Sequence, residues 1–112
     1  MKPEDRVRLE HMIEAARSAL RFMAGRTRTD LDTDLMLLFA VVRAVEIVGE
    51  AASRVSAAGR AAMPDVPWPA VIGMRNRLIH AYFDIDKEVV WKTVTEELPP
   101  LLTALEAALE GK

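Results

Sequence analysis

Between Leu35 and Ala52 the chain reads LMLLFAVVRAVEIVGEAA, an apolar run that is interrupted by the charged residues Arg43, Glu46 and Glu50. Apolar positions recur at spacings of three and four along one side of this run, as in a helix, and further apolar residues lie on the other side. A helix that is apolar nearly all round is either central to its fold or shared with a neighbouring subunit. Because a chain of 112 residues can scarcely enclose such a helix on every side, we expect a homodimer.

Working outward from this run, we expect a single domain over residues 1–112 with an all-α fold, a small up-and-down bundle of four to five helices. Ala, Leu, Glu and Arg are common and aromatic residues make up 5%, which favours helices over strands. The first expected helix begins at Pro3 and ends before Gly25, and the second runs from an N-cap at Asp32 or Thr33 to about Ala57. The third runs from about Trp68 towards His80 or Tyr82. Asp86 caps the fourth, and Pro99 and Pro100 kink or restart the last helix.

The composition excludes several classes of protein. There is no cysteine, so the chain has neither disulfides nor a thiolate metal site nor a cysteine nucleophile. No apolar run reaches the roughly 18 residues of a membrane span, and the N-terminus lacks the apolar core of a signal peptide. A cytoplasmic location with no membrane association is therefore the default expectation. The formal net charge of −2 argues against a general nucleic-acid coat protein but allows a local basic site.

One window of the sequence has a charge pattern of its own. From Val66 to Phe83 there is no acidic residue, yet Arg75, Arg77 and His80 lie within it. A guanidinium offers forked donors for phosphate oxygens and stays charged, whereas an imidazole titrates near neutral pH and can pass a proton in either direction. Together these groups suit chemistry on a phosphodiester.

Helical geometry limits this interpretation. Residues five apart are separated by about 140° on a helix, so Arg75 and His80 cannot share one face of a regular helix, whereas Asn76 and His80 can. A long side chain, a distorted helix end or a second subunit would have to close the gap. An arginine and a histidine near a helix end are also often only solvated or C-capping groups. Spacing alone therefore does not establish an enzyme.

The run from Arg75 to Tyr82, RNRLIHAY, contains the pattern Arg-x4-His-x-Tyr. It resembles the motif of the HEPN superfamily and, more narrowly, the form found in its HepT-like toxins. Neighbouring segments agree with this resemblance: Trp68 and the Ile-Gly-Met at 72–74 precede the motif, and the run at 44–52 is similar to the second-helix signature of the same family. The bare Arg-x4-His pattern recurs by chance, but the combined pattern covers most of the chain.

The resemblance implies a helical bundle that dimerises and places two copies of the motif side by side in a cleft. It also implies a metal-independent endoribonuclease without a cofactor, acting as the toxin of a type VII-like toxin–antitoxin pair. On this sequence His80 would be the general acid/base, and Arg75 would bind the scissile phosphate. Asn76 and Arg77 would support the site. The only other histidine, His11, lies in a different helix, and no set of residues has the spacing of metal ligands.

The family also implies a partner. Its antitoxins are small nucleotidyltransferases, and the tyrosine of the His-x-Tyr element is modified with AMP groups, which here would be Tyr82. Such a modification would place negative charge and bulk two residues from His80 and block RNA. The alternative for Tyr82 is that it only packs or contacts RNA.

Two questions stay open at the level of sequence. Glu46 and Glu50 either pair with Arg43, Arg54 or the motif arginines, or form a solvent-facing stripe. The chain itself is either the ribonuclease just described or a non-catalytic nucleotide-binding or accessory subunit that docks a nucleotidyltransferase. A purely structural interaction domain would leave the acid-free window unexplained.

Overall fold

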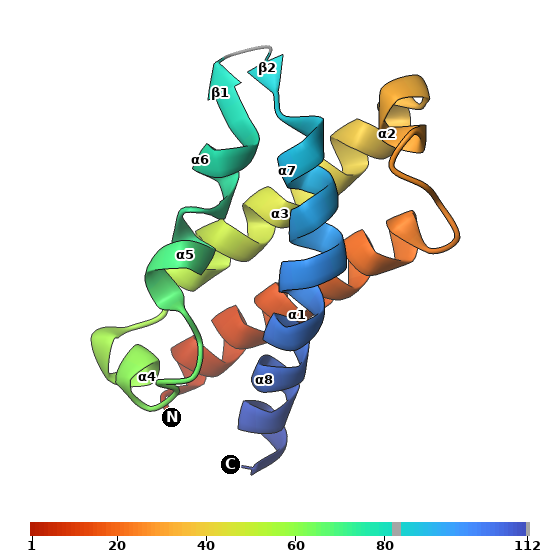
Figure 1. Ribbon diagram of the computed structural model, residues 1–112. Coiled ribbons are helices and arrows are strands. Elements are labelled where there is room, and N and C mark those ends of the chain that lie inside the picture. Colours follow the sequence, from red (N-terminus) through yellow and green to blue (C-terminus); the bar gives the residue numbers. More distant parts are fainter. Residues whose placement is uncertain (82–83, 112) are drawn as a thin grey trace.

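The computed structural model describes residues 1–81 and 84–111, without the side chains of His80 and Ala81. Within these residues the chain is mostly helical, as the sequence predicts (Figure 1). The elements are α1 (Pro3–Met23), α2 (Asp30–Thr33), α3 (Leu35–Ser53), α4 (Ala57–Ala61), α5 (Trp68–Ile72), α6 (Met74–Leu78), β1 (Ile79–Ala81), β2 (Asp84–Ile85), α7 (Lys87–Lys92), the π-helix η1 (Thr93–Glu97) and α8 (Leu98–Gly111).

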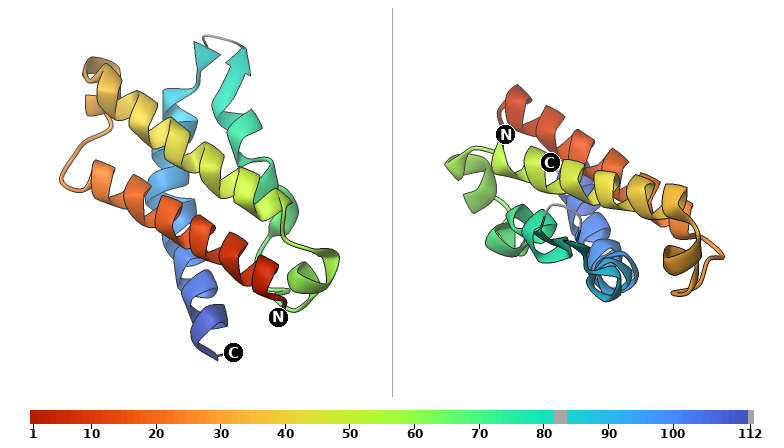
Figure 2. Two further views of the ribbon diagram at one scale, coloured as in Figure 1. Left: turned by 180° about the vertical axis from the view of Figure 1, so that it is seen from behind. Right: turned by 90° about the horizontal axis from the view of Figure 1, so that it is seen from above.

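The elements form two layers. α1 and α3 lie side by side in one layer, and α7, η1 and α8 form a continuous column across the opposite side, next to α4, α5 and α6 (Figure 2). The core lies between the layers and is filled by fully buried side chains from both: Leu9, Met12, Val41, Val45, Val48, Val71, Leu78, Val90, Val94, Leu98 and Leu105. Among the described helices, none is both long enough and apolar enough to cross a membrane.

The first helix has the bounds that the sequence predicts. Pro3 occupies its first turn, where a missing N–H costs nothing, and Glu4 and Asp5 place negative charge at the positive end of the helix dipole. The chain turns after Met23 at Gly25, whose φ of 74° is a left-handed conformation that glycine adopts without strain.

The second long helix is shorter than predicted at both ends. Asp34, not Asp32 or Thr33, is its N-cap, and the Asp34 carboxylate accepts a hydrogen bond from the backbone N–H of Leu37 at 3.0 Å. Arg26 donates to Asp34 at 2.7 Å and thereby holds the pKa of that carboxyl below its ordinary value. The helix ends at Ser53, because the side chain of Ser56 caps a separate helix, α4, by accepting from the N–H of Gly59 at 3.0 Å.

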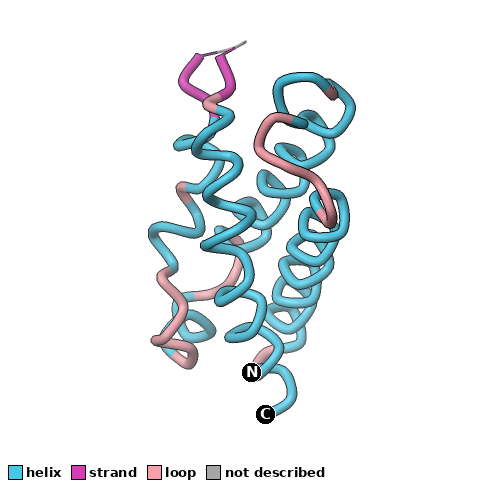
Figure 3. The backbone as a smooth tube through the Cα atoms, turned by 45° about the vertical axis from the view of Figure 1, so that its right-hand side comes forward, coloured by secondary structure: helices cyan, strands magenta, loops and turns pink. Residues whose placement is uncertain are grey.

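The segment that carries the motif is divided more finely than predicted. A single helix from Trp68 towards His80 or Tyr82 was the expectation, but α5 and α6 are separate short helices and the chain then enters a two-stranded antiparallel hairpin (Figure 3). Ile79, at φ −121° and ψ 108°, is already extended and pairs with Ile85 across the hairpin. The β-branched side chains at both positions favour this extended backbone over another helical turn.

The position of α5 follows from a close backbone approach. A Cβ added at Gly49 of α3 would lie 3.3 Å from the carbonyl oxygens of both Val71 and Ile72, so glycine allows α5 to rest directly on α3. At its other end α5 is anchored by the Trp68 indole, whose N–H donates to the carbonyl of Met63 at 3.1 Å. These contacts place the following helix, α6, against the middle of α3.

The last part of the chain agrees in part with the prediction from the sequence. Asp86 caps α7, as predicted, by accepting from the N–H of Val89 at 3.1 Å. The break expected at Pro99 and Pro100 takes the form of the π-helical segment η1 just before them, and α8 continues without a separate start. A proline in a helix removes one backbone donor and crowds the preceding turn, and the wider turn of a π-helix accommodates both effects.

Candidate active site

The motif residues sit where α6 ends and the hairpin begins. Arg75 and Asn76 are exposed on α6, and His80 follows two residues after the helix, in β1. The helix therefore ends before His80, and the backbone between Arg75 and His80 is not one regular helix. The His80 side chain lies outside the part of the chain that is described, as does Tyr82 as a whole.

Arg75 faces α3. Its Nε donates to Oε2 of Glu46 at 2.9 Å, while its side chain remains 52% exposed. Glu46 is far less exposed, at 19%, and its second oxygen, Oε1, lies 3.4 Å from Nη1 of Arg43. Glu46 thus pairs with a motif arginine, which decides one of the questions left open by the sequence. The Glu50 side chain, 58% exposed, lies 3.5 Å from Arg43.

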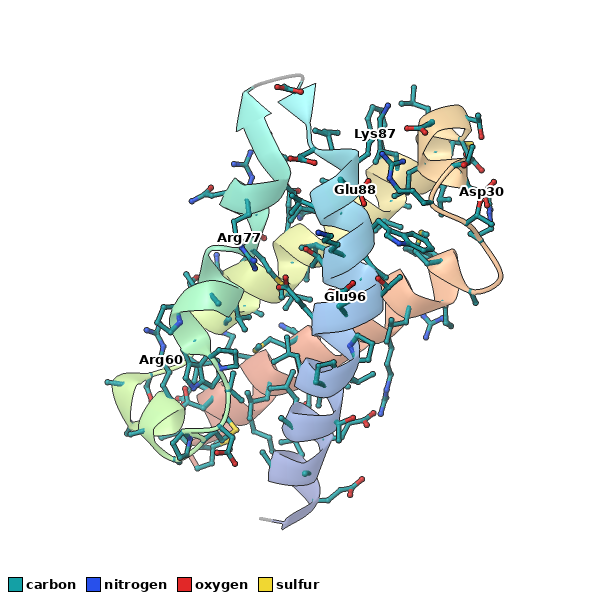
Figure 4. The ribbon with its side chains drawn as sticks, in the orientation of Figure 1. Asp30, Arg60, Arg77, Lys87, Glu88 and Glu96 are labelled. Atoms are coloured by element: carbon teal, nitrogen blue, oxygen red, sulfur yellow. The ribbon has the colours of Figure 1, made fainter. Side chains whose placement is uncertain are left out.

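Arg77 points the other way. Residues two apart on a helix are separated by about 200°, so Arg75 and Arg77 leave α6 on opposite sides. The guanidinium of Arg77 donates to Oε1 of Glu97 at 3.0 Å and to the carbonyl of Ala70 at 3.4 Å. Arg77 projects from α6 towards the column that contains η1 (Figure 4). The structure therefore does not bring the two motif arginines together.

The acid-free window is not a bare cationic surface in three dimensions. Each of its arginines meets a carboxylate from elsewhere in the chain, Glu46 from α3 and Glu97 from η1. Glu46 is among the partners that the sequence suggests, but Glu97 is not, since nothing in the spacing of 20 residues between Arg77 and Glu97 indicates a contact. Among the described residues, no three histidine, aspartate or glutamate side chains are grouped so that they could hold a metal ion.

A groove with mostly apolar walls runs along the outer side of the α1–α3 layer. Its volume is about 520 Å³, and it is lined by His11, Glu14, Ala15, Ser18 and Phe22 from α1 and by Ala40, Arg43, Ala44 and Ile47 from α3. Beside it, the first turns of α3 expose large apolar side chains: Leu35 (62%), Met36 (83%) and Phe39 (55%). Clustered exposed apolar residues of this size mark an interaction surface more often than ordinary solvent-facing surface.

The groove and the motif are connected through two ion pairs. Arg43 lines the groove and contacts Glu46, and Glu46 in turn holds Arg75. A molecule seated in the groove would therefore lie close to the α6 end of the motif.

Comparison with known proteins identifies a matching family and several related chains. A model of the ribonuclease HepT-like family matches residues 12–108. The chain is 36% identical over 98 residues to a candidate RNase of Methanocaldococcus jannaschii, an overlap that covers 88% of this chain and 90% of the relative. It is 39% identical over 101 residues to a candidate ribonuclease HepT of Thermococcus cleftensis, which covers 90% of this chain and 92% of the relative.

A candidate RNase of Caldanaerobacter subterraneus is 34% identical over 93 residues, which is 83% of each chain. No solved structure matches the chain significantly. The family model spans most of the sequence, including the second half of α1, all of α3 and the segment with Arg75 and His80. The chain therefore belongs to the HepT-like ribonuclease family.

Proposed function

We propose that this protein is an endoribonuclease that cleaves RNA without a metal ion, through Arg75 and His80. The observation that carries the proposal is the half-exposed, oriented guanidinium of Arg75 on a helix that ends just before His80, in a chain of the HepT-like ribonuclease family. His80 acts as general acid/base on the ribose 2′-hydroxyl or the leaving oxygen. Arg75 binds the scissile phosphate and stabilises the charge that develops in the transition state.

Asn76, exposed beside Arg75, orients these groups or the RNA by hydrogen bonding. Arg77 supports the site indirectly, since its contacts to Glu97 and Ala70 hold α6 against the rest of the domain. Attack by the neighbouring 2′-hydroxyl restricts the reaction to RNA, because DNA lacks the nucleophile.

The active form in this proposal is a homodimer in which two copies of the motif share one cleft. What supports it is the apolar surface on α3, where Met36 and Phe39 are largely exposed next to the groove lined by Phe22. Within each copy, Arg43 in the groove is linked to Arg75 through Glu46. When two copies cover this surface on each other, the Arg75 of each copy therefore lies near the edge of their shared interface.

The biological role in this proposal is that of the toxin in a type VII-like toxin–antitoxin pair in the cytoplasm. The partner is a small nucleotidyltransferase that transfers AMP from ATP to the hydroxyl of Tyr82 and so neutralises the toxin, in a complex of at least two toxin chains. The added phosphate stands two residues from His80 in the sequence, where it would repel RNA and attract Arg75.

A second candidate is a non-catalytic subunit that binds a nucleotide or docks a nucleotidyltransferase. One observation favours this second candidate: Glu46 and Glu97 pair with the two motif arginines and so reduce the net positive charge that is available to bind RNA. Incubation of the purified chain with RNA in EDTA separates the two. The ribonuclease cleaves RNA under these conditions, whereas the accessory subunit binds its partner or nucleotide and leaves RNA intact at every protein concentration.

A further inference from the structure

The contact between Arg75 and Glu46 has an asymmetry that a simple surface ion pair does not require. Glu46 lies in the middle of α3, one of the two longest helices, and is 19% exposed, whereas Arg75 is 52% exposed. The acid is thus the fixed partner and the arginine is the one presented to solvent. The described bond uses Nε of Arg75, and no described residue bonds its two terminal nitrogens.

The chemistry of the guanidinium gives this asymmetry a consequence. Its five N–H donors lie in one rigid plane, so an acceptor on Nε fixes the orientation of the whole group. The N–H donors on the edges of the guanidinium that do not face Glu46 remain available to another acceptor. A phosphate oxygen can accept from them without displacing Glu46, so the acid can remain in place while RNA is bound.

The two oxygens of Glu46 have different partners. Oε2 lies 2.9 Å from Arg75, a full hydrogen bond, whereas Oε1 lies 3.4 Å from Arg43, close to the outer limit of one. Arg43 is also shared with Glu50, at 3.5 Å. The stronger of the two interactions is therefore the one with the motif arginine.

We propose that Glu46 is a positioning residue for RNA cleavage: it holds the Arg75 guanidinium in the orientation that receives the scissile phosphate. The inference rests on the proposed ribonuclease function and deepens it. Glu46 acts only through Arg75 and does not contact the reacting atoms. The competing explanation is an ordinary surface ion pair, which contributes little to stability and nothing to the rate.

Steady-state cleavage of RNA separates these explanations. Glu46→Ala removes the acceptor, Glu46→Gln keeps the shape but removes the charge, and Glu46→Asp keeps the charge with a shorter reach. Because displacing a binding group by about 1 Å can cost on the order of 100-fold in rate, we expect Glu46→Ala to lower kcat by at least about 10-fold with a change in KM below about threefold. Glu46→Asp should recover part of the loss.

The matched control is Glu50→Ala, one turn further along α3. Glu50 contacts Arg43 but not Arg75 in the described structure, so its loss should change kcat by less than about twofold. Circular dichroism and the Tm of each variant show whether the fold is retained. An active wild type whose kcat is the same in Glu46→Ala would overturn the inference.

A second measurement reports the orientation of the Arg75 guanidinium and does not depend on catalysis. The Nε–H of Arg75, bonded to a carboxylate, should give a resolved side-chain signal in ¹H–¹⁵N spectra of the free protein, assigned by its loss in Arg75→Lys. We expect this signal to shift or broaden away in Glu46→Ala and to persist in Glu50→Ala. An unchanged signal in Glu46→Ala overturns the inference whether or not the chain cleaves RNA. A wild type that never cleaves RNA refutes the proposed function instead, and the spectra then decide alone whether Glu46 orients Arg75.

Discussion

The Nε of Arg75 on α6 lies 2.9 Å from Oε2 of Glu46 on α3, although 29 residues separate them in the sequence. This contact ties the motif to the long central helix, and through Arg43 to the groove on the outer side of α1 and α3. The motif, the central helix and the candidate dimer surface therefore belong to one connected set of residues.

The first prediction concerns the exposed apolar surface of α3. If the chain forms the proposed homodimer, Phe39→Glu should convert it to a monomer, because the substitution places a charge where an apolar side chain, 55% exposed in the single chain, would be buried against the second copy. Light scattering after size exclusion measures the mass directly. RNA cleavage should fall together with the dimer if the cleft needs both copies.

The control for this prediction is Ala107→Lys, an exposed position on α8 at the other side of the molecule. It changes the surface charge but should leave the mass and the cleavage rate as in the wild type. A wild type that is already monomeric, or a Phe39→Glu variant that remains dimeric, would show that this surface is not the interface.

The second prediction concerns Arg77, which the structure turns away from Arg75. If Arg77 acts mainly by tying α6 to η1, Arg77→Ala and Glu97→Ala should lower the free energy of unfolding by similar amounts. The side chains are 43% and 40% exposed, so the coupling from a double-mutant cycle in urea should be about 0.2–1 kcal/mol. Additive effects of the two substitutions would mean that the ion pair contributes nothing.

The third prediction concerns pH and the buried Asp5, which is 3% exposed. The hydroxyl of Ser56 donates to the Asp5 carboxylate at 2.6 Å and the Ser56 N–H at 2.8 Å, and these hydrogen bonds lower the pKa of Asp5. A lowered pKa in the folded state stabilises the fold above the unfolded value of about 3.9, and this contribution is lost as the pH falls through the folded value.

The Tm difference between wild type and Asp5→Asn should therefore be largest near neutral pH and shrink as the pH falls below about 4. Asp65→Asn, at an exposed position between α4 and α5, serves as the control for the substitution itself. A Tm difference for Asp5→Asn that stays constant with pH would show that the ionisation of Asp5 does not stabilise the fold.

The fourth prediction concerns Tyr82. The intact mass of the wild type should increase by whole AMP units after incubation with the cognate nucleotidyltransferase and ATP, and that of Tyr82→Phe should not. The modified wild type should also lose RNA cleavage in proportion to its modified fraction. Equal mass increases in both proteins would rule out Tyr82 as the acceptor.

Long helices were the part of this fold that the sequence predicted well. The first helix starts at Pro3 as predicted, and the cap at Asp86 is found as expected. Such features depend on residues close together in the chain. The start of α3 was missed by one or two residues because three acidic residues, Asp30, Asp32 and Asp34, compete as caps, and the Arg26 contact to Asp34 is not evident from local pattern.

The site was predicted less completely, for a physical reason. Arg75 and His80 could be named from the sequence, but the extended backbone at Ile79 depends on pairing with Ile85, which a helical pattern up to Leu78 does not reveal. The opposite directions of Arg75 and Arg77 follow from helix geometry, yet their partners, Glu46 and Glu97, come from elements far away in the sequence. Tertiary contacts, not local propensity, decide which charges in the window remain available.

The most direct test of the proposed function compares one RNA with its 2′-deoxy counterpart. Both are incubated in EDTA with the purified wild-type chain, free of any partner, and with His80→Ala. We predict that the wild type cleaves the RNA and leaves the deoxy strand intact, and that His80→Ala cleaves neither. Cleavage of RNA by His80→Ala at the wild-type rate, or wild-type activity that appears only when a divalent ion is added, would contradict the mechanism.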